Sequence, residues 1–269
     1  MHVQLNVYSA PKEGYRPDEW EDGGAGGAGG GRGADPAICR FAVADGATET
    51  YDSMRWVRQL IGSFLTWKQP SGARWPKLER ESMTSWFTAM QEQWMDTAPA
   101  GTDFIEQAKI RQGTLATFVG CQVVGLDTRA PAWRAVALGD SVLFHVRDGQ
   151  LLDQFPRLRS TDFASAPEGI STLPQQLGRM SEHLQFREGR LAAGDLIFAA
   201  TDAFAQWMTA RAEEGDPRLW ELLGGLVHDS AFERLIAGER RSRAMKDDDV
   251  TLLRIRLLTQ PATKVMVCQ

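Results

Sequence analysis

Cysteine and histidine are scarce in this chain of 269 residues, and neither is spaced as in a metal site. The three cysteines, Cys39, Cys121 and Cys268, are odd in number and far apart, which indicates neither a disulfide framework nor a CxxC metal site. The four histidines form no HxxxH pair. A zinc site is therefore not expected. Carboxylates are the remaining metal ligands, and they suit Mg²⁺ or Mn²⁺.

The sequence also lacks long apolar runs and an excess of positive charge. No segment approaches the roughly 18 consecutive apolar residues that a membrane helix needs, and the N-terminus does not have the pattern of a secretory signal. The net charge of -5 argues against a nucleic-acid surface, which normally shows clustered lysine and arginine. We therefore expect a cytoplasmic protein that binds neither a membrane nor nucleic acid.

Glycine, in contrast, is concentrated in one tract. Residues 23–33 are all glycine except Ala25, Ala28 and Arg32, and this composition predicts a flexible loop. The tract contains a formal GxGxxG, but any glycine tract matches that pattern, and a strand is expected after it instead of a helix. A dinucleotide site is not indicated.

Hydrophobic periodicity predicts strands and helices in an α+β order. Strands are expected at 3–8, 39–44, 114–124, 133–138, 142–146, 150–152, 196–200 and 250–258. Helices are expected at 51–67, 78–95, 102–111, 203–212, 217–228 and 230–243. Two packed sheets covered by helices suit this order better than two separate domains.

Two connecting regions carry further expectations. The strands within 114–152 predict an antiparallel meander in which Gly139-Asp140-Ser141 is a tight turn. Residues 153–190 are polar and rich in turn formers, which predicts a long surface excursion or flap near a site.

Four aspartates, Asp45, Asp140, Asp202 and Asp248, stand at the ends of apolar segments or beside them. Carboxylates that converge at strand ends repel one another unless a cation neutralises them. Two divalent ions about 3.5–4 Å apart would do so, and would lower the pKa of a bound water towards neutrality. An aspartate beside glycine can also be only a turn residue. We accept that simpler interpretation for Asp148 and for Asp195.

Six segments together resemble motifs of the metal-dependent protein phosphatases of type 2C, the PPM family, over roughly 9–258. The segments are Glu21-Asp22, Phe41-Ala42-Val43-Ala44-Asp45-Gly46, Gly113-Thr114, Gly139-Asp140-Ser141 with the following Arg147-Asp148-Gly149, Leu191 to Asp202, and Asp248-Asp249-Val250-Thr251. The resemblance implies a four-layer αββα sandwich of two antiparallel sheets flanked by helices. It also implies a single phosphatase domain over 1–269, with a loop at 23–33, a flap at 153–190 and a short tail at 259–269.

The resemblance assigns a binuclear Mg²⁺ or Mn²⁺ centre to the cleft between the sheets. Asp45 would bridge the two ions, with the Gly46 carbonyl on one of them, and Asp202 and Asp248 would complete the shell of the other. Asp140 has the weakest link to the site, because its turn also serves the structure.

The first motif is expected to act beside the metals. The resemblance implies that Glu21 and Asp22 act on metal-bound waters, and that an arginine grips the phosphate, for which Arg16 is the nearby candidate. The chain departs from the family at Ala47, where many members have histidine, and at Ala203, where they have glycine.

The implied activity is hydrolysis of phosphoserine or phosphothreonine in proteins by a metal-bridging hydroxide. Asp45, Asp202, Asp248, Glu21 and Asp22 would be the catalytic residues, and the enzyme would oppose a serine/threonine kinase. Two alternatives remain: a phosphatase-like regulatory or binding module with weak catalysis, and a hydrolase of small phosphoesters on the same fold.

Overall fold

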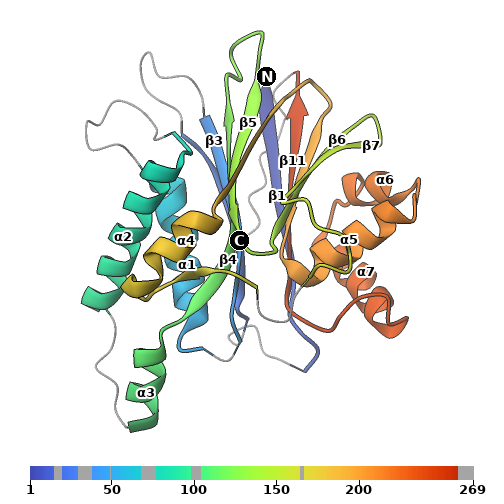
Figure 1. Cartoon of the computed structure of the whole chain (residues 1–269). Helices are drawn as coiled ribbons and strands as arrows, with labels where there is room; N and C mark the ends of the chain where they lie inside the picture. The colour runs from blue at the N-terminus through green and yellow to red at the C-terminus, as the bar shows by residue number, and fades with distance from the viewer. Residues whose placement is uncertain are drawn as a thin grey trace.

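The computed structural model describes residues 1–14, 20–29, 38–48, 50–67, 77–97, 104–163 and 167–259. In these ranges the chain forms two antiparallel sheets that face each other (Figure 1). The first sheet has the order β1 (His2–Ala10), β11 (Val250–Leu258), β10 (Leu196–Ala200), β6 (Val142–Arg147) and β7 (Gln150–Phe155). The second has the order β2 (Asp22–Gly29), β3 (Ile38–Gly46), β4 (Leu115–Val124), β5 (Ala132–Leu138) and β9 (Gln185–Arg190), and β8 (Ile170–Ser171) pairs with β4.

Helices cover the outer faces of both sheets (Figure 1). On the side of the second sheet lie α1 (Ser53–Thr66), α2 (Arg80–Thr97), α3 (Phe104–Gln112) and, after the short turn η2 (Pro174–Gln176), α4 (Leu177–His183). On the side of the first sheet lie α5 (Asp202–Glu213), α6 (Leu219–Gly224) and α7 (Asp229–Arg241). The predicted four-layer αββα architecture is confirmed. Among the described residues, no helix has the length and apolar character needed to cross a bilayer.

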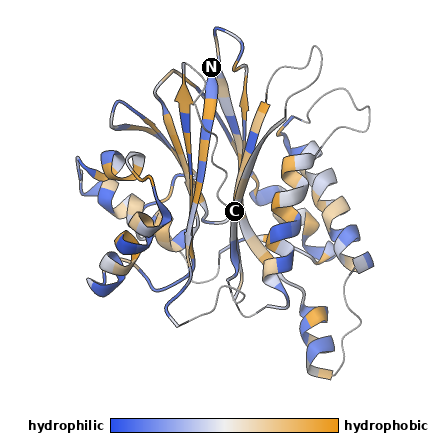
Figure 2. Cartoon of the chain, turned by 180° about the vertical axis from the view of Figure 1, so that it is seen from behind, coloured by the Kyte–Doolittle hydropathy of each residue, from blue (hydrophilic) through white to orange (hydrophobic). Residues whose placement is uncertain are grey.

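Three hydrophobic cores separate the four layers. Alternate residues of β3 serve two of them: Phe41 and Val43 pack between the sheets, whereas Ala42 and Ala44 pack against the helices. A strand buried on both faces reads as a continuous apolar run, which is why β3 was visible in the sequence. In Figure 2 the hydrophobic colour follows the strands in the middle of the molecule, and the outer helices carry both colours.

The glycine tract is only in part the loop that its composition predicts. Residues 22–29 form β2, which pairs with β3 along its length. The glycines are needed because neighbouring side chains lie against the strand: a Cβ on Gly23 would lie 2.6 Å from Val57, and one on Gly26 would lie 2.1 Å from Leu5. Glycine here permits close packing, and the expectation of a loop was wrong for this part.

Residues 114–152 do not form one meander. β4 pairs with β5 in the second sheet, whereas β6 pairs with β7 in the first. Gly139-Asp140-Ser141 therefore carries the chain from the second sheet to the first. In a meander β5 would pair with β6, but here β5 pairs with β9 and β6 pairs with β10. Gly139 has φ +100, and a Cβ there would lie 2.5 Å from the Glu168 carbonyl oxygen. The crossover places Asp140 between the sheets.

The expected excursion at 153–190 is more regular than its polar sequence suggests. It contains the end of β7, the short β8, η2, α4 and the edge strand β9. Met180 and Leu184 are buried in the core between helices and sheet, and Phe186 packs against it. These few apolar residues are spaced too widely to give a periodic signal, so the sequence reads as a loop.

Some expectations fall outside the described residues. Arg16, the remainder of the glycine tract at 30–33, Cys268 and residues 260–269 of the expected tail are all in this group. The role of Arg16 stays a prediction from the sequence.

Candidate metal centre

Asp22 and Asp45 lie opposite each other at one end of the second sheet. Asp45 is the penultimate residue of β3, and its register partner on β2 is Asp22. Directly opposed residues have Cβ atoms about 4.5–5.5 Å apart, so two carboxylates there repel each other. Burial raises the pKa of both carboxyls well above the usual range, and the charge of Asp202 adds to the shift. A cation beside these two carboxyls would therefore stabilise their charged forms.

Asp140 joins this pair from the crossover between the sheets. Its residue is only 4% exposed, and neither carboxylate oxygen has a hydrogen-bond partner within the described ranges. Burial, followed by the charge of Asp202, raises the pKa of Asp140 to about 7. The neighbouring Ser141 is held by a hydroxyl–hydroxyl hydrogen bond of 2.7 Å to Thr117. We call Asp22, Asp45 and Asp140 the inner carboxylates.

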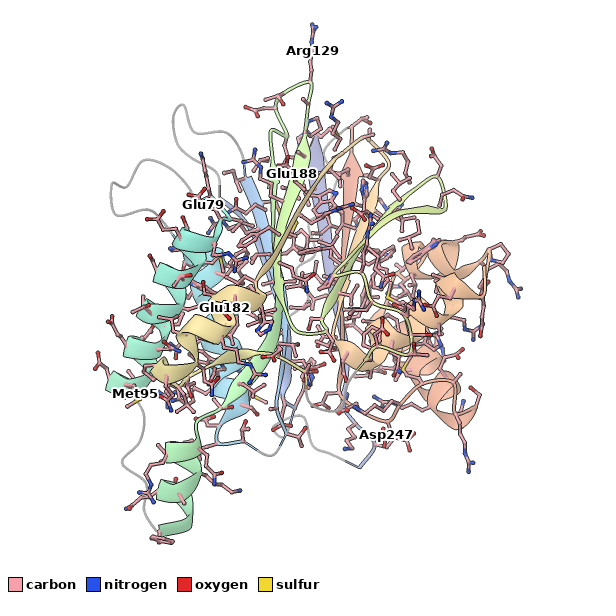
Figure 3. All side chains as sticks on the ribbon, in the orientation of Figure 1. Glu79, Met95, Arg129, Glu182, Glu188 and Asp247 are labelled. Atoms are coloured by element: carbon pink, nitrogen blue, oxygen red, sulfur yellow. The ribbon has the colours of Figure 1, made fainter. Side chains whose placement is uncertain are left out.

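Asp202 and Asp248 form an outer pair of carboxylates. Asp202 is the first residue of α5 and is separated from the end of β10 by Thr201, and Asp248 lies just before β11. Lys246 Nζ lies 2.6 Å from Asp248 Oδ2 and 3.4 Å from Asp202 Oδ2. The adjacent Asp247, labelled in Figure 3, marks this end of the sandwich, opposite the end that carries Arg129. Unlike the inner carboxylates, the outer pair already has a cation beside it.

Asp249 and Glu21 hold the loops around the site. The two carboxylate oxygens of Asp249 accept hydrogen bonds of 2.8 Å each, one from the backbone N–H of Lys12 and one from that of Glu21. Glu21 Oε1 accepts a 2.8 Å hydrogen bond from the Ser53 hydroxyl at the start of α1. The Glu21 carbonyl accepts one of 3.2 Å from the Gly46 N–H. Asp249 thus fixes the backbone at Lys12 and Glu21. Its place next to Asp248 in the sequence gave no sign of this structural role.

Thr201 links the two sheets at the same place. Its hydroxyl donates a 2.6 Å hydrogen bond to Asp22 Oδ2 and accepts one of 2.9 Å from the Thr251 N–H. Thr201 follows β10 in the first sheet, whereas Asp22 begins β2 in the second. Sequence reasoning treated Thr201 only as the neighbour of Asp202. The one available signal was a hydroxyl residue between an apolar strand and a candidate ligand.

Comparison with solved structures assigns the fold. No family model and no curated protein matches the sequence. The Mycobacterium tuberculosis serine/threonine phosphatase PstP/Ppp matches at 15% identity over 96% of this chain and 100% of that chain, with a TM-score of 0.59. The catalytic domain of PstP in complex with two manganese ions matches at 14% identity over 96% of this chain and 100% of that chain, with a TM-score of 0.57. The serine/threonine phosphatase Stp1 from Staphylococcus aureus matches at 12% identity over 96% of this chain and 96% of that chain, with a TM-score of 0.58. The chain has the PPM phosphatase fold.

The PPM fold brings most of the predicted residues to one end of the sandwich. Asp202 lies close enough to Asp22 and Asp45 for its charge to raise the pKa of both. Asp248 joins them through Lys246, and Glu21 directly precedes Asp22, the first residue of β2. The candidate set is therefore one spatial cluster, although its members span most of the sequence.

The donor chemistry of this cluster suits Mg²⁺ or Mn²⁺, because all of its side-chain ligands are oxygen. As they stand, no three histidine, cysteine, aspartate or glutamate side chains in the described part of the chain converge closely enough to hold a metal ion. The buried, unpartnered carboxylate of Asp140 and the repulsion between Asp22 and Asp45 are what a cation would relieve. The inner carboxylates fit a divalent ion once their side chains turn towards it.

Proposed function

We propose that this chain is a metal-dependent phosphatase that hydrolyses phosphoserine or phosphothreonine in proteins, with Mg²⁺ or Mn²⁺ as the cofactor. The observation that carries the proposal is the buried carboxylate of Asp140, which has no hydrogen-bond partner among the described residues and lies close enough to Asp45 for its charge to act there. Three carboxylates without a neutralising cation are costly to keep in a core unless they bind one.

In this proposal the aspartates of the cluster hold the metal ions. Asp45 pairs with Asp22 on one side and with Thr117, the hydrogen-bond partner of Ser141, on the other, and it would help to hold the metal together with the Gly46 carbonyl. Asp202 and Asp248 would hold the outer ion. Bound divalent ions would supply charge neutralisation on the phosphoryl oxygens and an activated water.

Glu21 and Asp22 would orient waters at the site. The hydrogen bond from Ser53 fixes the Glu21 carboxylate at the start of α1, and the hydrogen bond from Thr201 fixes that of Asp22. No acid side chain stands at Ala47, so the leaving group would take its proton from a water. Arg16 remains the candidate for gripping the phosphate.

The test measures Mn²⁺-dependent hydrolysis of para-nitrophenyl phosphate and of a phosphothreonine peptide. We expect Asp45→Asn and Asp202→Asn each to reduce turnover by about 100-fold or more, because each removes charge that holds an ion. Asp148→Asn is the matched control: it makes the same chemical change at an exposed hairpin position away from the cluster. It should leave turnover unchanged.

The absence of turnover in the wild type, together with the absence of Mn²⁺ binding by calorimetry, would contradict the enzyme proposal. Turnover of para-nitrophenyl phosphate without turnover of the phosphopeptide would favour a hydrolase of small phosphoesters. Mn²⁺ binding without any turnover would favour a phosphatase-like regulatory module. Ala47 and the lysine beside Asp202 and Asp248 are the observations that favour this last candidate.

The expected partner is a phosphorylated protein whose kinase acts on serine or threonine. The serine/threonine phosphatases that share this fold support a phosphoprotein substrate at the level of analogy between folds. The cytoplasmic location and the single domain over 1–269 stay predictions from the sequence.

A further inference from the structure

Lys246 is a cation that the chain itself supplies to the outer pair. Its ammonium lies within ion-pair distance of both carboxylates, at 2.6 Å from Asp248 and 3.4 Å from Asp202. It is also close enough for its charge to act on Asp140. The ammonium therefore stands where a divalent ion bound by Asp202 and Asp248 would carry its charge.

The backbone around Lys246 is fixed on both sides. Met245 is buried in the core between the first sheet and its helices, and its N–H donates to the Glu239 carbonyl of α7. The Arg240 side chain donates to the Asp248 carbonyl and lies 3.5 Å from the Asp247 carboxylate. On the other side, Asp249 is tied to the ends of β1 and β2. The segment thus aims Lys246 at the outer pair.

The side chain of Lys246 can nevertheless move away from the two carboxylates. It is 53% exposed, whereas those of Asp202 and Asp248 are 16% and 26% exposed. A lysine ammonium on a flexible four-carbon stem can leave its partners for water by a change of side-chain rotamer, because half of the side chain is already solvated. The ion pair can open without disturbing the backbone that positions it.

The inner carboxylates have no cation at ion-pair distance among the described residues, and the charge of Lys246 acts on Asp140 from farther away. In the described part of the chain no lysine or arginine forms an ion pair with Asp22, Asp45 or Asp140. The two halves of the cluster therefore differ in charge balance. An incoming ion meets inner carboxylates without an ion-pair partner among the described residues, and an outer pair whose negative charge one ammonium already offsets in part.

We propose that Lys246 competes with a divalent ion for Asp202 and Asp248, so that the outer position fills only after the inner one and at a higher metal concentration. This inference rests on the metal centre of the proposed function. It makes Lys246 a positioning residue that sets the metal concentration at which the centre becomes complete.

The test measures Mn²⁺ binding to the full chain by calorimetry and by the electron paramagnetic resonance signal of free Mn²⁺. Lys246→Met removes the charge and keeps the length of the side chain. We expect its weaker binding step to tighten by about tenfold or more, because two partly buried carboxylates lose their competitor. Lys246→Arg keeps the charge and should keep the weak step. Circular dichroism checks that each variant is folded.

The matched control is Lys109→Met, which removes the same charge from an exposed position on α3. It should leave both binding steps unchanged. Equal affinities in the wild type and Lys246→Met, or an equal gain in Lys109→Met, would overturn the proposal while the metal centre stands. No Mn²⁺ binding in any of these proteins would overturn the metal centre and this proposal together. Binding that tightens in Lys246→Met without any phosphatase activity would support this proposal and contradict the enzyme.

Discussion

Two buried aspartates of this molecule have opposite surroundings. Asp195 is fully buried, yet its carboxylate accepts hydrogen bonds from Arg147 Nε at 2.7 Å, from His145 Nε2 at 2.9 Å and from the Ala192 N–H at 2.8 Å. The Trp133 indole donates to His145 Nδ1, which leaves the proton of His145 on Nε2. Asp140 is almost as buried, and within the described residues its carboxylate has no hydrogen-bond partner.

The pKa values of the two groups follow this difference. Burial alone would raise the pKa of Asp195, but the hydrogen bonds from Arg147 and His145 hold it below the usual value of 3.8. At Asp140 burial and the charge of Asp202 act together and raise the pKa to about 7. The Asp195 carboxylate has a structural role, and hydrogen bonds from the surrounding fold satisfy its oxygens. A carboxylate that the fold leaves unsatisfied is a candidate for binding something else.

The largest expected effect is at Asp195. Asp195→Asn should lower the free energy of unfolding by about 3 kcal/mol, because Arg147 and His145 lose a buried charged partner. Urea unfolding at neutral pH measures it. A cost below about 0.5 kcal/mol would show that the network adds little to stability, and the contrast with Asp140 would then lose its meaning.

The second effect is the pH dependence of the metal-free protein. A carboxyl whose pKa is raised by folding binds a proton in the folded state that the unfolded state does not bind, so stability falls as pH rises. For Asp140 this window runs from the usual value of 3.8 to about 7. We expect Asp140 to contribute about 2 kcal/mol to the fall in the free energy of unfolding between pH 5 and 7, measured as the difference between the wild type and Asp140→Asn, and Mn²⁺ to reduce that contribution.

Asp195 should not contribute to that slope. Its pKa is lowered in the folded state, so its stabilisation is complete above the usual value of 3.8 and is lost only as pH falls through the lower folded value. Asp195→Asn should therefore leave the slope between pH 5 and 7 unchanged. A slope that is reduced in Asp195→Asn and unchanged in Asp140→Asn would reverse our assignment.

The third effect is at Asp140 itself and has the opposite sign to that at Asp195. Asp140→Asn in metal-free protein at pH 8 should raise the free energy of unfolding by about 1 kcal/mol, since a buried, unpaired charge is removed and an amide with unpaired donors replaces it. With saturating Mn²⁺ the variant should be the less stable protein. Thermal unfolding with and without Mn²⁺ measures both, and a loss of stability in both conditions would contradict the contrast.

The smallest effect concerns the geometry of the Asp195 network. Arg147 reaches Asp195 with two nitrogens, at 2.7 and 2.8 Å, and its side chain is 36% exposed. Arg147→Lys keeps the charge but loses the two-pronged contact, so it should cost about 0.5–1 kcal/mol in urea unfolding. A cost as large as that of Asp195→Asn would mean that geometry, not charge, dominates the network.

Much of the fold was predictable because strand and helix signals in this chain are local. The apolar runs of β3, β4 and β10 and the alternation in β11 reflect burial that each segment carries in its own sequence. β2 was missed because glycine carries no such signal. Its strand forms through pairing with β3 and close contact with Val57 and Leu5, which lie elsewhere in the chain.

The candidate site divides in the same way. The sequence by itself determined that aspartates stand at the ends of apolar strands, and the order of the motifs pointed to the PPM fold, because both features lie in short contiguous segments. Only the tertiary structure decided that the chain changes sheets at Asp140, that Thr201 ties Asp22 to the opposite sheet, and that Lys246 lies on Asp202 and Asp248. Each of these depends on contacts between residues far apart in sequence, and no local pattern of residues encodes them.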